Sequence, residues 1–179
     1  MNATYAMIGS HPTLRFERRL RHTVERVWRA ITEPSELAHW FPSTVELELR
    51  VGGRMTFTFE QDLSEYAELP EGTHTLRGEV TALEPPHLFA FTWGDDQLRF
   101  ELEPADGGAS TELRFSVVLD ATDKAARDAA GWHVCLDGLE HHLGGAETEA
   151  PGDEPTDEWR GVYERYAARG FPTGAAIPG

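Results

Sequence analysis

The sequence predicts an α+β fold in which an antiparallel sheet of about seven strands is covered by a long C-terminal helix, with two short helices after the first strand. Three observations predict it. Apolar residues alternate with polar ones in a run of segments between residues 45 and 119. Short connections between these segments favour antiparallel pairing. Residues 132–143 carry apolar side chains at helical spacing instead, and an apolar sheet face needs such a cover.

The first strand and both short helices are expected before residue 42. Residues 13–21 alternate between apolar and polar side chains, except that Arg18 interrupts the apolar face. Thr23 is a candidate helix N-cap, and apolar residues follow it at helical spacing as far as Ile31. Pro34 opens a second helical turn over residues 35–40, and Pro42 ends it.

Six further strands and the long helix account for most of the remaining chain. The strands are expected over residues 45–51, 55–59, 76–83, 88–93, 98–102 and 111–119, with a tight turn at Gly52-Gly53. An acidic loop, 61–73, is either a lid or a plain surface loop. The long helix covers 122–143, and one narrow stripe on it contains Trp132, Leu136, Leu139 and Leu143.

These elements divide the chain into a loose leader (1–12), a main domain (13–145), an acidic linker (146–156), an appended helix (157–170) and a tail (171–179). The appended helix carries an apolar side with Trp159 and Tyr166 at its ends, so it needs a surface to cover. That surface is either its own domain or a second copy. The expected state is therefore a monomer or a homodimer.

Charge and cysteine content exclude several classes of function. The 179 residues hold 16 Lys+Arg against 31 Asp+Glu, a formal net charge of −15. Such a chain repels polyanions, so we expect no nucleic-acid partner and no binding to anionic membranes. Cys135 is the only cysteine, which precludes an internal disulfide, and no signal peptide is apparent. The expected location is the cytoplasm.

A set of short motifs occurs in a recognisable order along residues 13–145. They are TVERVWRAIT from Thr23 to Thr32, then Pro34, Leu37, Trp40, Phe41, Gly52-Gly53-Arg54, Gly78, Val80, Glu84-Pro85-Pro86, Leu88, Thr92-Trp93, Gly131-Trp132, Leu136, Leu139 and Leu143. This ordered set resembles the SRPBCC (START/Bet v-like) superfamily with its helix-grip fold. The nearer resemblance is to the AHSA-type branch, named after activators of the heat-shock-protein-90 ATPase.

The resemblance implies a sheet curved around the long helix, with an apolar cavity between them that holds a small hydrophobic molecule. Strand parity and the helix stripe supply the candidate lining: Trp40, Phe41, Phe57, Phe59, Phe91, Trp93, Phe100, Phe115, Trp132, His133 and Leu136. The alternative is that these side chains simply fill a core.

No catalytic set, cofactor motif or metal site is predicted. His133, Asp137 and His141 lie four residues apart, but their helix face is expected to point to solvent, with His133 nearest the cavity edge. Cys135 is expected to be a small buried residue, since it flanks the apolar stripe.

Three functions stay open at this point. The first is a carrier or sensor of small hydrophobic molecules without catalysis. The second is an enzyme, cyclase-like or hydrolase-like, acting on a hydrophobic or aromatic substrate in the same cavity; it requires inward polar groups within hydrogen-bond reach of one another. The third is a co-chaperone-like interaction module with an exposed apolar patch. We favour the first, because no catalytic set is recognisable.

Overall fold

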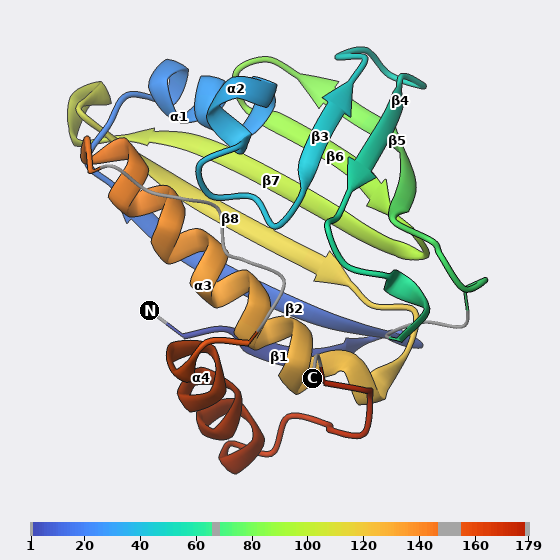
Figure 1. The fold of residues 1–179 in the computed structure, drawn as a ribbon. Helices are drawn as coiled ribbons and strands as arrows, with labels where there is room; N and C mark the ends of the chain where they lie inside the picture. Colours follow the sequence, from blue (N-terminus) through green and yellow to red (C-terminus); the bar gives the residue numbers. More distant parts are fainter. Residues whose placement is uncertain (1, 66–68, 147–154, 178–179) are drawn as a thin grey trace.

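A computed structural model describes residues 2–65, 69–146 and 155–177. Within them one antiparallel sheet has the strand order β1–β2–β8–β7–β6–β5–β4–β3, and α3 (Ala125–Leu143) lies across one of its faces (Figure 1). This confirms the predicted α+β helix-grip architecture. The strands are β1 (Thr4–Ile8), β2 (His11–Leu20), β3 (Thr44–Leu47), β4 (Arg54–Thr58), β5 (Thr75–Glu84), β6 (Leu88–Trp93), β7 (Asp96–Ala105) and β8 (Ser110–Val118).

The sheet has eight strands rather than about seven, because part of the predicted loose leader is a strand. β1 pairs with β2 from Thr4 opposite Arg15 to Ile8 opposite His11, so β2 begins two residues earlier than expected. β1 lacks an alternating apolar pattern because it covers little of the core. Gly9, at φ +61°, makes the tight turn that joins the two strands.

The strand predicted over 45–51 ends at Leu47, which leaves the side chains of Leu49 and Val51 exposed. The amide of Gly52 donates to the Val80 carbonyl at 2.8 Å, so residues 48–53 turn back onto β5 instead of extending β3. A Cβ on Gly53 would lie 1.9 Å from the Glu48 carbonyl oxygen. The glycine pair therefore serves a wider turn than the tight hairpin that was predicted.

The helices of the domain lie where they were predicted, except that the second short helix ends at Leu37 and not at Trp40. α1 (Val24–Thr32) begins at Thr23, whose hydroxyl accepts from the Arg26 amide at 3.4 Å, and α2 (Pro34–Leu37) follows directly. Both lie at one end of the sheet (Figure 1). On α3 the predicted stripe is buried in full: Trp132, Leu136, Leu139 and Leu143. A short 3₁₀ turn, Thr122–Lys124, precedes α3.

The appended helix, α4 (Asp157–Ala168), packs against α3 of its own chain. Val162 and Tyr166 are buried there, and Phe171 continues the same buried surface after the helix ends. Part of the predicted tail contacts the start of α3, since the Ala126 amide donates to the Pro172 carbonyl at 3.0 Å and Arg127 Nη1 donates to the Ala176 carbonyl at 3.1 Å. Of the predicted acidic linker, residues 147–154 lie outside the described residues.

Candidate functional site

The nine aromatic residues of the predicted cavity lining form one connected set of rings between the sheet and α3. We call this set the ring cluster. Neighbouring ring centroids are 4.3–6.4 Å apart, with Phe41 at the centre. Its members are Trp40, Phe41, Phe57, Phe59, Phe91, Trp93, Phe100, Phe115 and Trp132. Leu136 is buried beside them on the α3 stripe. Parity on the strands and periodicity on the helix place these side chains on the same interior surface.

Two local features hold the rings in place. The Trp40 indole N–H donates to the Ala30 carbonyl at 2.9 Å, which ties the segment after α2 to α1. The Phe57 ring lies directly over Gly78 of β5, where a Cβ would be 2.9 Å from Phe57 Cε2. The glycine therefore provides the space that this aromatic ring occupies.

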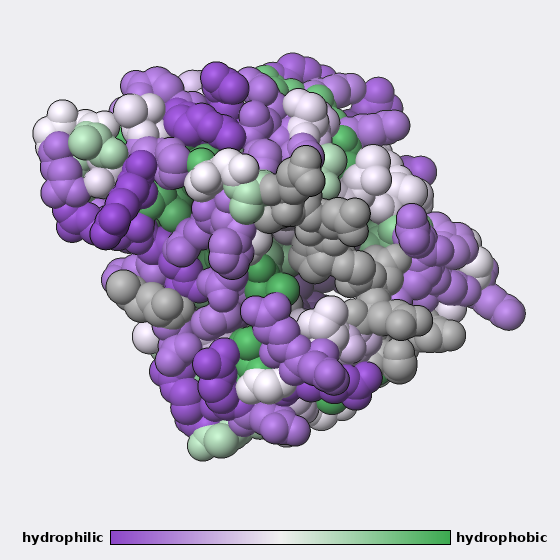
Figure 2. Space-filling view, turned by 60° about the vertical axis from the view of Figure 1, so that its left-hand side comes forward, coloured by the Kyte–Doolittle hydropathy of each residue, from purple (hydrophilic) through white to green (hydrophobic). Residues whose placement is uncertain are grey.

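Phe59 and Trp93 carry the ring cluster to the protein surface. Both are only partly buried, and their centroids are 5.6 Å apart. Most of the face in Figure 2 is hydrophilic, and its hydrophobic residues gather in a hollow between the end with α1 and α2 (top) and the end with α4 (bottom). The partial exposure of the Phe59 and Trp93 side chains gives the ring cluster a boundary with solvent.

The loop predicted as a lid or surface loop, 61–73, starts two residues after Phe59. Asp62 ties its two described ends together by accepting from the Ser64 amide at 2.9 Å and the Gly72 amide at 2.8 Å. These backbone hydrogen bonds lower the pKa of the Asp62 carboxyl to about 2. Tyr66 and its neighbours at 67 and 68 lie outside the described residues, so the choice between lid and loop stays a prediction.

His133, predicted at the cavity edge, contacts α4 instead of the rings. Its side chain is buried, and its Nδ1 lies 2.8 Å from the Tyr166 hydroxyl. The expectation that this helix face points to solvent is wrong for His133, because α4 covers it. Asp137 is half-buried on the same face, and only His141 of the three is exposed.

Arg18, Asp137, Glu140, His133 and Tyr166 form a polar cluster, as we call it, between β2, α3 and α4. The Tyr166 hydroxyl accepts from the Ala3 amide at 2.8 Å and also lies 2.8 Å from His133 Nδ1. On the other side of the imidazole ring, Nε2 lies 3.3 Å from Asp137 Oδ2. Burial raises the pKa of the Tyr166 hydroxyl.

The cluster is anchored by Arg18, the residue that interrupts the apolar face of the first predicted strand. Its side chain is only 3% exposed, and its guanidinium lies 3.2 Å from Asp137 Oδ1 and 3.3 Å from Glu140 Oε1. Burial raises the pKa of Asp137, but hydrogen bonds and charges from His133 and Arg18 outweigh it and lower the net value. The inward parity of Arg18 was the sequence signal for this cluster.

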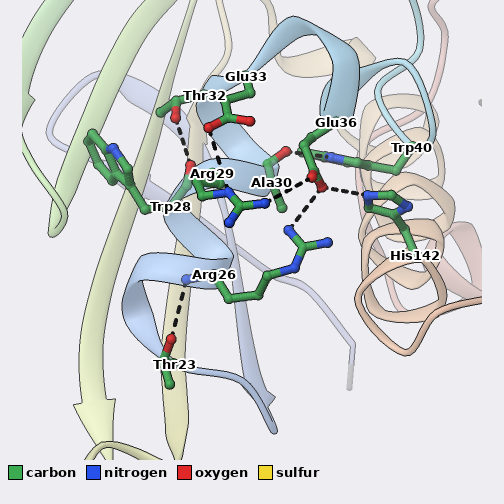
Figure 3. Close-up of polar contacts among 10 residues, drawn as sticks. All are labelled: Thr23, Arg26, Trp28, Arg29, Ala30, Thr32, Glu33, Glu36, Trp40 and His142. Carbon is green, nitrogen blue, oxygen red and sulfur yellow. Dashed lines mark hydrogen bonds and ion pairs between the residues drawn. The ribbon is translucent and has the colours of Figure 1, made fainter.

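A second polar centre fastens α1 and α2 to the last turn of α3 (Figure 3). Glu36 Oε2 lies 2.9 Å from Arg26 Nη1 and 2.7 Å from His142 Nε2. Burial raises the pKa of Glu36, but the hydrogen bonds and charges of His142 and Arg26 lower it below its ordinary value. The His142 ring also stacks on His39 at 4.6 Å. Glu36 thereby supports the chain that carries Trp40.

Replacing Glu36 by glutamine (Glu36→Gln) is expected to lower the free energy of unfolding at pH 7 by about 1.5–3 kcal/mol, because hydrogen bonds to a charged group are lost. A lowered folded-state pKa contributes stability above the unfolded pKa and loses it as pH falls through the folded value. The difference from the parent protein should therefore shrink as the pH falls below the ordinary glutamate pKa of about 4.3. Urea unfolding at several pH values measures it.

Glu33→Gln is the matched control, since the exposed Glu33 carboxylate pairs only loosely with Arg29, at 3.6 Å. This substitution should lower the free energy of unfolding by at most about 0.5 kcal/mol, at pH 7 and at acidic pH alike. Equal losses in the two variants would contradict the role assigned to Glu36.

Several negative expectations concern the described part of the chain. No group of three or more His, Cys, Asp and Glu side chains there is placed to hold a metal ion. No described helix is long and apolar enough to cross a membrane. Cys135 is buried as predicted, and burial raises the pKa of its thiol to about 12.

Two further rings adjoin the ring cluster but were absent from the predicted lining. Phe16 of β2 lies 5.8 Å from Phe115, and Phe89 of β6 lies 4.8 Å from Phe91. Each has the strand parity of an inward residue, so parity was a sufficient signal for both.

A family model described as Activator of Hsp90 ATPase homolog 1-like protein matches residues 21–144. A conserved protein of unknown function from Enterococcus faecalis has a similar structure, with a TM-score of 0.70 at 24% identity over 93% of this chain and 89% of that one. CalU16 from Micromonospora echinospora has a TM-score of 0.66 at 18% identity, over 93% of this chain and 94% of that one. A protein from Mesorhizobium loti has a TM-score of 0.60 at 25% identity, over 74% of this chain and 96% of that one. No curated protein matches the sequence.

Proposed function

The chain belongs to the family of Activator of Hsp90 ATPase homolog 1-like proteins, within the SRPBCC superfamily, and we propose that it binds a small hydrophobic molecule without converting it. The ligand occupies the region between the sheet and α3, against the ring cluster. The observation that carries this proposal is the continuity of rings from the buried Phe41 through Trp93 to the partly exposed Phe59.

Entry of a ligand requires some rings to move, because the members of the ring cluster already contact one another. Phe59 and Trp93 are partly exposed and lose the least packing when they rotate. Behind them, Phe41 and Trp132 are buried and provide a fixed apolar wall. The ligand site is therefore expected on the inner side of Trp93.

A flat aromatic or polyketide-like molecule suits this wall best. Aromatic rings prefer offset or edge-to-face contacts, and the Trp93 ring already makes edge-to-face contacts with Phe41 and Trp132 at 5.3 and 5.6 Å. A planar ligand that enters beside Trp93 replaces such contacts with similar ones. The ring cluster contains no charged side chain, so apolar contacts are expected to select this ligand.

Titration with 2-naphthol, a neutral bicyclic aromatic probe, tests the proposal by NMR. The five tryptophans each give an indole N–H signal, and single Trp→Phe variants assign them. We expect saturable shifts at Trp93 and Trp132. The signals of Trp28, which packs on Phe89, and of Trp159, on α4, serve as internal controls and should stay in place. Shifts confined to these controls, or no saturable shift, would overturn the proposal.

A second candidate function is enzymatic, and the polar cluster is the observation that favours it. Tyr166, His133 and Asp137 are inward polar groups within hydrogen-bond reach of one another. They lie at the contact between α3 and α4, however, whereas the ring cluster lies on another side of α3. Under the binding proposal, His133→Gln leaves the affinity for 2-naphthol unchanged. A large loss of affinity would place His133 at the ligand and favour the enzyme.

A further inference from the structure

The outer face of the sheet, opposite α3, carries a depression near the β1–β2 turn. Its volume is about 270 Å³, and it is lined by Ile8, His11, Thr13, Arg15, Gln97, Ser116 and Val118. Because it lies on the far side of the sheet from the ring cluster, it is independent of the function proposed above.

Strand register explains how these residues come together. Thr13 of β2 is opposite Val118 of β8, which in turn is opposite Gln97 of β7. Arg15 is opposite Ser116 in the next outward-facing row. Thr13 is only 4% exposed although it faces outward, so the depression has a covered floor.

The lining contains no carboxylate, unlike the rest of this face. Elsewhere on this face arginines are paired with acids: Arg99 with Glu101 at 3.2 Å, and Arg114 with Glu103 at 3.0 Å. Arg15 makes no such ion pair within residues 2–65, 69–146 and 155–177. In a chain of net charge −15, the depression therefore offers an anion an arginine that no described carboxylate pairs with.

We propose that this depression binds a small organic anion with a short apolar part. The Arg15 guanidinium donates to the carboxylate, a geometry that arginine matches with two parallel N–H groups. The Ser116 hydroxyl and the Gln97 amide lie in the same lining and supply further donors. Ile8, which is 42% exposed, and Val118 cover the apolar part.

Butyrate is the probe for this site, and its neutral analogue butyramide tests the need for charge. We expect saturable shifts of the backbone amide signals of Thr13, Gln97 and Ser116 with butyrate and none with butyramide. Arg15→Gln should weaken butyrate binding about tenfold, the effect of losing a charged hydrogen bond. Arg114→Gln removes the same charge from the same face and should change the affinity less than twofold.

Three outcomes would overturn the proposal: no saturable shift with butyrate, equal shifts with butyramide, or equal weakening by Arg15→Gln and Arg114→Gln. The last would indicate attraction by the overall charge rather than a site. Unfolding curves of both variants check that neither substitution has disturbed the sheet. Because 2-naphthol binding is read at Trp93 and Trp132, the two proposals fail or succeed separately.

Discussion

Replacing both carboxylates that face Arg18 by their amides (Asp137→Asn with Glu140→Gln) is expected to lower the free energy of unfolding by about 3 kcal/mol. Arg18 is 3% exposed, and the two acids lie 3.2 and 3.3 Å from its guanidinium nitrogens. Their removal takes two carboxylates away from a buried cation, which costs more than an ordinary lost contact. Urea unfolding followed by circular dichroism measures the change.

The control is the pair Glu101→Gln with Glu103→Gln, which changes the net charge equally. These acids pair with Arg99 and Arg114 on the outer face, where all four side chains are well exposed. We expect this control to lower the free energy of unfolding by no more than about 1 kcal/mol. Adding Arg18→Met to the Asp137 and Glu140 variant should restore stability, because an apolar side chain then replaces the buried charge. If the control costs as much, or Arg18→Met restores nothing, burial of the charge is not the cause.

Gly78→Ala is expected to destabilise the protein by about 2–3 kcal/mol and to disturb the ring cluster. The new methyl group would lie 2.1 Å from the Thr92 carbonyl oxygen and 2.9 Å from Phe57 Cε2. One of these neighbours is backbone of the paired strand β6, so the strands must separate locally. The expected result is a lower urea midpoint together with a shifted Trp93 indole signal, since the Phe57 and Trp93 rings are 4.5 Å apart.

Gly161→Ala provides the matched control for this substitution. Gly161 is exposed on α4, and a Cβ there meets nothing within 4 Å. Alanine is the better helix former, so this variant should gain up to about 1 kcal/mol. A Gly78→Ala protein of unchanged stability and unchanged Trp93 signal would contradict the role of Gly78 as the floor beneath Phe57.

The ring cluster was predictable because the repeat of apolar residues, every second residue in a strand and about every 3.6 residues in a helix, indicates which side chains share a face. Phe57, Phe100 and Trp132 come from three different elements, yet each obeys the rule of its own element. β1 escaped prediction because a short edge strand with little core to cover has no such pattern. The turn at residues 48–53 escaped because its hydrogen bond to Val80 joins segments distant in sequence.

The sequence by itself determined the family, the order of the elements and the apolar interior, because these depend on local periodicity and on motifs read along the chain. Only the tertiary structure decided the surroundings of His133 and Arg18. The surroundings of His133 depend on α4, which folds back onto α3. Those of Arg18 depend on a contact between β2 and acids of α3 that lie more than a hundred residues away in the sequence. A helical angle describes where a residue points on its own helix. What it meets there is decided by the elements that pack against that face.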